Sequence, residues 1–364
     1  MKAAVFDGEH IEVVDVDLAA PGPGEVQVDI VAAGVCHSDL HVVRREWEVP
    51  TPLVLGHEGS GVVSALGAGV IGLAVGDHVV LSWVPNCGKC RYCLLGRPAQ
   101  CQMVAQVVAP GGVLYDGTSR LSRGGKTIHH YLGVSSFAQR AVVPESGAIK
   151  VRDDAPLDLM ALVGCAVATG VGAVRNTAGL PKGATCAVIG CGGVGLAVIQ
   201  GARLEGASII VAVDIAPEKL TLAKKLGATH TLLVGSGVDV PHALKDLVPE
   251  GLDYIFDAIG KITTTEQAIE SLGLGGAAVI VGLPPTGQSA QFDPLVLAEA
   301  DQRILGCNYG SAVPATDIPR LVDEVMSGDL DLESMVSARR PLEEVNSALE
   351  DLASGAALRQ LLLT

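Results

Sequence analysis

The alternation of apolar and polar positions changes character near the middle of the chain. Up to about residue 156, short apolar runs such as 25–31 and 61–64 are separated by turns rich in glycine and proline. Runs of this length, bounded by turn residues, are typical of β-strands. The first part of the chain is therefore predicted to be rich in β-structure.

From about residue 185, apolar runs alternate with amphipathic stretches of helical length. Strands are predicted at 185–189, 209–213, 254–256 and 277–281, and helices at 194–205 and 217–226. This alternation indicates a parallel sheet with helices on both faces. Beyond about residue 310, helices are predicted at 318–326 and 342–353, followed by a closing strand at 358–363.

The composition indicates a globular protein and argues against nucleic acids and membranes as partners. The 364 residues suggest two domains, and a chain that is 49% hydrophobic and 18% charged is typical of globular proteins. A net charge of −15 repels phosphate backbones and anionic lipids, so we expect no nucleic-acid partner and no membrane association. The apolar run at 184–202 contains several glycines and fits a strand, a turn and a helix better than a membrane span.

The cysteine pattern points to metal binding in a reducing compartment. The amino terminus lacks a secretory pattern, which makes a cytoplasmic location the expectation. Four of the nine cysteines lie close together, at Cys87, Cys90, Cys93 and Cys101. Four thiolates at this spacing suit tetrahedral zinc, and a closed shell leaves no position for a substrate, so the site is predicted to be structural. Free or disulfide-paired cysteines and an iron–sulfur cluster are the alternatives.

A glycine-rich turn predicts a dinucleotide site. The turn follows the strand at 185–189, opens a helix and matches G-x-G-x-x-G through Gly190, Gly192, Gly193, Val194 and Gly195. Its glycines allow pyrophosphate to approach the positive end of that helix. Asp214 ends the next strand, where a carboxylate would bind the adenosine ribose and repel a 2′-phosphate, so NAD is favoured over NADP. A glycine-rich turn without a nucleotide is the alternative.

Three scattered residues, Cys36, His57 and Cys165, are individually ambiguous, because a lone cysteine in an apolar stretch more often packs in a core. Together with the four-cysteine loop and the glycine-rich turn, however, the segments around them resemble the zinc-containing medium-chain alcohol dehydrogenases in order and spacing. The resemblance extends over essentially the whole chain. It implies an α/β protein with a GroES-like β-rich catalytic domain at 1–165 and 310–364, and a Rossmann domain with a doubly wound parallel sheet at 166–309.

By this resemblance, Cys36, His57 and Cys165 are the ligands of a catalytic zinc whose fourth position is open to water or alcohol, as a Lewis-acid site requires. Two zinc ions per chain are then expected. Ser38 would take the alcohol's proton and pass it, through the nicotinamide ribose, to His41 and solvent. Asp39 would orient His57, and Glu58 would lie behind the metal. Further cofactor contacts are implied at His37, Thr169, Lys219, Val281, Leu283 and Arg359. The family also implies a homodimer, with a tetramer as the second possibility.

The expected reaction is reversible hydride transfer from a primary alcohol to NAD, which yields an aldehyde. Trp47 and Trp83 correspond to tryptophans that narrow the pocket of yeast-type enzymes, whereas 111–131 resembles the long loop of animal and plant enzymes and adds Tyr131 and Leu132 to the pocket.

Two alternatives to this reaction remain open. The first is a formaldehyde dehydrogenase that acts on a glutathione-type thiol adduct. This chain lacks the basic anchor usual in such enzymes, since Ala105 occupies that region, and Trp47 and Val49 stand where acidic contacts would be. Arg44 and Arg45 could supply the missing basic charge. A zinc-binding protein without catalytic activity on the same scaffold is the other alternative.

Overall fold

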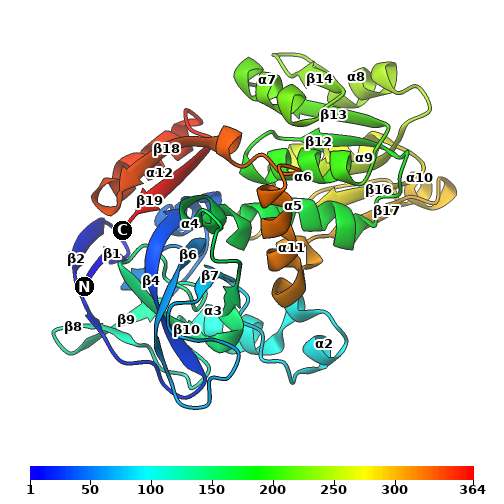
Figure 1. The fold of residues 1–364 in the computed structure, drawn as a ribbon. Helices are drawn as coiled ribbons and strands as arrows, with labels where there is room; N and C mark the ends of the chain where they lie inside the picture. The colour runs from blue at the N-terminus through cyan, green and yellow to red at the C-terminus, as the bar shows by residue number, and fades with distance from the viewer. The chain divides into compact units, whose positions relative to one another are not determined.

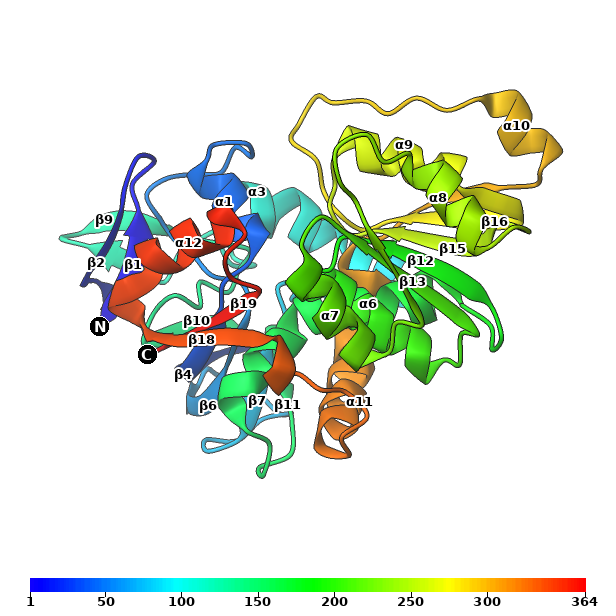
Figure 2. The same cartoon turned by 90° about the horizontal axis from the view of Figure 1, so that it is seen from above.

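The computed structural model describes residues 1–364, which form two compact units. One, called here the β-rich unit, contains Met1–Cys165 and Val313–Thr364. The other, called the α/β unit, contains Ala166–Ala312. Figure 1 shows the ribbon coloured along the chain, and Figure 2 shows it turned by 90°.

The β-rich unit contains two sheets. The six-stranded sheet has the order β2 (Ile11–Asp15), β1 (Lys2–Phe6), β5 (Leu53–Val54), β9 (Lys126–His130), β8 (Leu121–Arg123) and β3 (Asp17–Leu18). The seven-stranded sheet has the order β11 (Ala148–Lys150), β7 (His78–Leu81), β6 (Gly59–Leu66), β4 (Glu25–Gly34), β19 (Arg359–Leu363) and β18 (Val336–Pro341), and β10 (Arg140–Pro144) also pairs with β4. The last strand of the chain therefore lies beside an early one.

Strand β4 is central to the seven-stranded sheet. Its side chains alternate, so that Val26, Val28 and Ile30 are buried in one core cluster, as a period of two requires. The strand is longer than the predicted run at 25–31 and delivers the chain to helix α1 (His37–Val43). The other helices of this unit are α2 (Arg91–Leu94), α3 (Ala109–Gly111), α4 (Leu157–Met160), α11 (Pro314–Met326) and α12 (Val345–Ser354).

The helix predicted at 342–353 begins later than expected. Residues Leu342–Glu344 form a 3₁₀ turn, and the α-helix starts at Val345. One face of α12 buries Val345, Leu349 and Leu352 against the core that contains Phe6. It ends at Gly355, whose left-handed φ of 76° is typical of a helix C-terminus.

The α/β unit has a parallel sheet with the order β14 (His230–Leu233), β13 (Ile209–Asp214), β12 (Thr185–Ile189), β15 (Leu252–Asp257), β16 (Leu272–Ile280) and β17 (Arg303–Gly306). Its helices are α5 (Ala166–Gly172), α6 (Gly193–Leu204), α7 (Pro217–Leu226), α8 (Val240–Leu247), α9 (Ile262–Glu270) and α10 (Pro294–Glu299). In Figure 2, α6 and α7 cover one face of the sheet and α8 and α9 the other. This is the parallel sheet with helices on both faces that the alternating pattern predicted, and it matches the Rossmann domain that the family resemblance implies.

No single helix is both long enough and apolar enough to cross a membrane. Only the bent pair of helices at 157–164 and 166–178 meets both criteria when the two are taken together.

A buried histidine makes the β-rich unit sensitive to acid. His130 ends β9 with 2% of its surface exposed, and its Nε2 atom accepts a hydrogen bond of 3.2 Å from the backbone N–H of Arg120. Burial lowers the pKa of His130 to about 3, and the positive charge of Arg120 adds to this effect. The folded protein therefore holds His130 neutral, whereas the unfolded chain takes up a proton below a pKa of about 6.5. Stability contributed by the neutral form is lost as the pH falls below that value.

We predict that His130→Gln weakens the loss of stability on acidification, because glutamine can accept the same hydrogen bond but does not titrate. Between pH 6.5 and 5.5, the unfolding free energy of the wild type should fall by up to about 1.4 kcal/mol more than that of the variant, the value for one proton per pH unit. Urea unfolding at the two pH values measures the difference. Equal pH dependence in both proteins would contradict this account.

Candidate metal centres and nucleotide-binding turn

The carboxylate of Asp39 connects two segments of the β-rich unit. Asp39 lies in the first turn of α1 and is fully buried. Its Oδ2 atom accepts a hydrogen bond from the backbone N–H of Cys36 at 3.1 Å, while Oδ1 accepts one from that of Gly56 at 3.1 Å. Oδ1 also lies 3.3 Å from Nδ1 of His57. One side chain thus positions both Cys36 and His57.

The three predicted ligands of the catalytic zinc lie together in a buried cluster. Potential ligand atoms of Cys36, His57, Glu58 and Cys165 all lie within 4.8 Å of one another. His57 directs Nδ1 to Asp39, and its buried Nε2 atom has no hydrogen-bond partner. Two thiols and an orphaned imidazole nitrogen form a Cys₂His donor set, which fits a zinc ion with an open position.

The pKa values in this cluster reflect its crowding. The hydrogen bond from Cys165, followed by the contact with His57, holds the pKa of Cys36 well below its usual range. The same thiol pair raises the pKa of Cys165. Burial opposes the charged form of His57, but the Asp39 carboxylate outweighs it and raises the pKa of His57. These shifts place negative charge on Cys36, the form that binds a metal cation.

Behind the cluster, Glu58 forms a buried ion pair with Arg359 at the start of β19. Burial raises the pKa of Glu58 to about 7, although Arg359 opposes this rise. A Cβ atom at Gly34 would lie only 2.0 Å from Oε2 of Glu58, so the pair needs a glycine there. Arg359, for which the resemblance implies a cofactor contact, is 3% exposed, and its Nε atom has no partner. Sequence reasoning identified neither the ion pair nor the role of Gly34.

The four cysteines of the loop also converge. The sulfurs of Cys87, Cys90, Cys93 and Cys101 lie within 4.8 Å of one another, around the short helix α2. Backbone N–H groups, that of Cys93 first, lower the pKa of Cys90 to about 6, whereas burial and the contact with Cys90 raise that of Cys93 to about 12. Four crowded sulfurs cannot all hold negative charge unless a cation compensates it. The arrangement fits a structural zinc site.

The predicted proton-transfer and pocket residues surround α1. Ser38 Oγ lies 3.9 Å from Sγ of Cys36, and the hydroxyl of Tyr131 donates to the Ser38 carbonyl at 3.1 Å. The ring of Tyr131 also meets that of His57 edge-on, with centroids 5.5 Å apart. Leu132, which follows it, has a left-handed φ of 53°. Tyr131 thus borders the predicted zinc ligands directly.

The two tryptophans have different surroundings. Trp47 stacks on His41 with ring centroids 4.5 Å apart, and His41 Nδ1 bonds to Glu46, a contact that sequence reasoning missed. Trp83, by contrast, packs against the core cluster that contains Val63.

In the α/β unit, the glycine-rich turn joins β12 to α6. Gly190 has a left-handed φ of 96°, and Gly192 is the N-cap of α6. Asp214 at the end of β13 accepts hydrogen bonds from the backbone N–H of Cys191 at 2.7 Å and of Ala216 at 3.0 Å. The predicted ribose-binding carboxylate therefore lies directly beside the predicted phosphate-binding turn.

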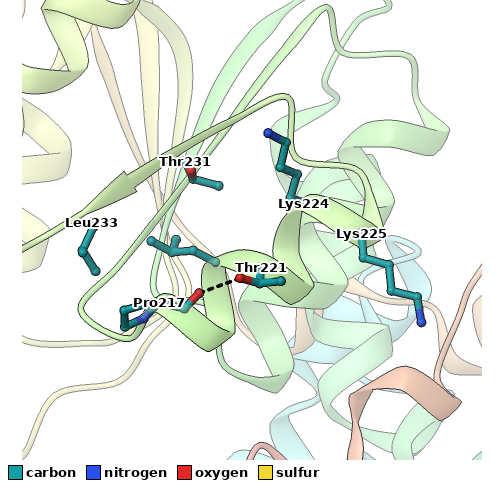
Figure 3. Close-up of a pocket in the computed structure, with 7 residues that line it drawn as sticks. Pro217, Thr221, Lys224, Lys225, Thr231 and Leu233 are labelled. Atoms are coloured by element: carbon teal, nitrogen blue, oxygen red, sulfur yellow. Dashed lines mark hydrogen bonds between the residues drawn. The ribbon is translucent and has the colours of Figure 1, made fainter.

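The remaining predicted cofactor residues differ in exposure. Thr169 in α5 is 9% exposed, Val281 after β16 is 6% exposed, and Leu283 is 51% exposed. Lys219 lies on α7, and His37 is exposed at the start of α1. A separate pocket lies between α7 and β14, lined by Pro217, Leu220, Thr221, Lys224, Lys225, Thr231 and Leu233 (Figure 3). It contains none of the predicted site residues.

Comparisons with known proteins agree with both units. A family model described as "Alcohol dehydrogenase GroES-like domain" matches residues 22–153, and one described as "Zinc-binding dehydrogenase" matches residues 193–327. The chain is 36% identical to a "Probable S-(hydroxymethyl)glutathione dehydrogenase 1" of Schizosaccharomyces pombe, with 98% of this chain and 95% of the relative covered.

Two further proteins are similar over nearly their whole length. An "Alcohol dehydrogenase class-3" of Drosophila melanogaster is 36% identical, with 96% of this chain and 93% of that protein covered. The crystal structure of a benzyl alcohol dehydrogenase from Acinetobacter calcoaceticus superposes with a TM-score of 0.93 at 36% identity, covering 100% of this chain and 98% of that chain.

Two glycines of the turn provide a matched test of the nucleotide site. A Cβ atom at Gly195 would lie 1.8 Å from the carbonyl oxygen of Gly190, whereas one at Gly192 meets nothing within 4 Å. Gly195→Ala should therefore destabilise the fold, by about 1–3 kcal/mol. Gly192→Ala should leave stability within about 0.5 kcal/mol of wild type. It should nevertheless weaken NAD binding roughly tenfold or more, because the added methyl group occupies space that pyrophosphate needs.

Thermal unfolding and NAD titration by calorimetry measure the two effects. If Gly192→Ala bound NAD as tightly as wild type, the turn would not be the pyrophosphate site.

Proposed function

Because this chain belongs to the zinc-containing medium-chain alcohol dehydrogenase family, we propose that it oxidises a hydroxymethyl group carried on a thiol, with NAD as the hydride acceptor. The general activity, that of an NAD- and zinc-dependent alcohol dehydrogenase, follows from the family. The family therefore favours an enzyme over the alternative of a zinc-binding protein without catalytic activity. Among substrates, the sequence favoured free primary alcohols, but the name of the Schizosaccharomyces pombe relative supports the thiol adduct better.

The alcohol-oxidation chemistry of this proposal rests on the buried cluster of Cys36, His57 and Cys165. When bound there, zinc supplies a Lewis acid that makes the hydroxyl proton of an alcohol easier to remove. Asp39 keeps the His57 ring oriented, and Tyr131 packs beside it. The second zinc belongs to the four-cysteine loop, where no coordination position is left for chemistry.

The hydroxyl proton of the substrate is transferred to solvent by side chains of α1. The Ser38 hydroxyl lies beside Cys36 and accepts the proton of the substrate hydroxyl. His41 is three residues further along the helix, on the same face as Ser38, and is partly exposed, so it can deliver the proton to solvent. Hydride transfer to nicotinamide requires the two carbons to be held within near-attack distance. The chain's contribution is to orient the substrate and to remove its proton.

Basic charge near the end of α1 supports the thiol adduct. Thiol carriers of the glutathione type bear carboxylates, which arginine binds well. Arg45 pairs with Glu9 at 3.5 Å, whereas Arg44 is exposed and forms no ion pair within the chain. Ala105, which occupies the region of the usual basic anchor, is exposed and uncharged. Arg44 is therefore the anchor that we propose.

A substrate panel with two matched variants tests the thiol adduct. S-hydroxymethylglutathione should give a higher kcat/KM than ethanol or benzyl alcohol. Arg44→Ala should raise KM for the adduct roughly tenfold, equivalent to about 1.4 kcal/mol, and leave benzyl alcohol unchanged. Arg45→Ala is the control, because Arg45 already has a partner. A higher kcat/KM for benzyl alcohol than for the adduct would favour a simple primary alcohol as the substrate instead.

We further propose a homodimer in which the edge strand β17 pairs with its copy. The sheet ends at β17, so its outer backbone groups have no neighbouring strand in the chain. Apolar side chains are exposed on β17 and the preceding segment: Ile304 by 37%, Phe292 by 48%, Leu295 by 62% and Val296 by 52%. An unpaired strand with apolar surroundings is suited to isologous pairing.

Ile304→Glu should convert the dimer to a monomer, because a carboxylate then faces its own copy across the paired strands. Light scattering coupled to size-exclusion chromatography measures the mass. Ile71→Glu, which changes a side chain that is 93% exposed in the β-rich unit, is the control. A monomeric wild type, or a variant that remains dimeric, would refute pairing through β17.

A further inference from the structure

Helix α1 ends in a turn that brings its last histidine against a glutamate. Arg44 is the C-cap, and Arg45 has a left-handed φ of 57°. The backbone N–H of Glu46 donates to the carbonyl of His41 at 2.9 Å, and that of Arg45 donates to the carbonyl of Val42 at 2.9 Å. These two bonds define a Schellman motif. In this motif, the side chains of the residues at the positions of His41 and Glu46 are neighbours, and they are usually apolar.

Here that apolar contact is replaced by a charged hydrogen bond. Nδ1 of His41 bonds to Oε2 of Glu46, and the two side chains are 21% and 30% exposed. The next residue, Trp47, stacks on the imidazole with centroids 4.5 Å apart and an interplanar angle of 22°. The His41 ring is therefore held at its edge by a carboxylate and on its face by an indole.

This arrangement decides which nitrogen of His41 can accept a proton. A carboxylate only accepts hydrogen bonds, so Nδ1 must carry the hydrogen, and the lone pair lies on Nε2. Nε2 has no hydrogen-bond partner in the chain. We propose that Glu46 is a positioning residue that sets His41 as the proton acceptor at Nε2 during alcohol oxidation. This inference rests on the proposed function, in which His41 carries the substrate proton to solvent.

The proposed step is balanced in atoms and charge. The alcohol loses a hydride to NAD and transfers its hydroxyl proton to Ser38. Ser38 in turn releases its own hydroxyl proton towards His41. The lone pair at Nε2 of His41 takes up that proton, and the resulting imidazolium keeps its Nδ1–H bond to the Glu46 carboxylate. The proton at Nε2 then leaves for water or a buffer base, and His41 returns to its starting form. Glu46 only accepts this hydrogen bond and transfers no proton.

A double-mutant cycle tests whether Glu46 acts through His41. Glu46→Ala should lower kcat for benzyl alcohol or S-hydroxymethylglutathione roughly tenfold, a fraction of what a general base contributes, and change KM little. Because Glu46 acts only through the histidine, Glu46→Ala should cause no further loss in a His41→Gln background. Glu48→Gln, an exposed glutamate two residues along, is the control and should behave as wild type. If kcat of the double variant fell by the product of the two single-variant factors, Glu46 would act independently of His41 and the proposal would be overturned.

Trp47 provides a readout that does not depend on turnover. In a Trp83→Phe background, Trp47 is the only tryptophan, and its stacked imidazole should quench its emission. Glu46→Ala should raise that emission to the level of His41→Gln, because the ring is no longer held. Unchanged emission in Glu46→Ala would overturn the positioning role even if the enzyme were active. A protein that reduced no NAD with either alcohol would refute the proposed function instead, while Trp47 emission would still report on Glu46.

Discussion

The buried carboxylate of Asp39 is the interaction on which the candidate metal centre depends. It accepts hydrogen bonds from the backbone N–H groups of Cys36 and Gly56 and holds Nδ1 of His57. It therefore joins the segment that follows β4 to the segment between β5 and β6. A fully buried carboxylate is costly unless its oxygens are hydrogen-bonded, and here both are. Because Nδ1 of His57 is occupied, its Nε2 atom is left for the cluster with Cys36 and Cys165.

The rest of the cluster depends on strand pairing between distant parts of the chain. Strand β19 pairs with the end of β4, opposite Gly34, and this pairing brings Arg359 to Glu58. The absence of a side chain at Gly34 leaves the space in which the two charges meet. The C-terminal segment therefore belongs to the β-rich unit and completes the environment of residues encoded near the amino terminus.

The two ends of α1 have separate tasks. Its N-terminus holds Cys36 and Asp39 in the buried cluster, whereas its C-terminus holds His41, Glu46 and Trp47 near the surface. At a rise of about 1.5 Å per residue, seven helical residues span roughly 10 Å. A helix of this length is enough to connect the buried candidate metal centre with the surface, and the left-handed Arg45 follows its end there.

The features that the sequence determined by itself are those made by residues close together in the chain. The four-cysteine loop, the glycine-rich turn with Asp214 and the parallel α/β pattern all follow from local spacing and periodicity, and family spacing singled out Cys36, His57 and Cys165. Only the tertiary structure revealed the Glu58–Arg359 pair, the need for Gly34 and the contact of His41 with Glu46. The first two depend on the pairing of strands more than 300 positions apart in the chain. The third depends on the left-handed backbone conformation of Arg45. Hydrophobic periodicity predicts neither the strand pairing nor this conformation.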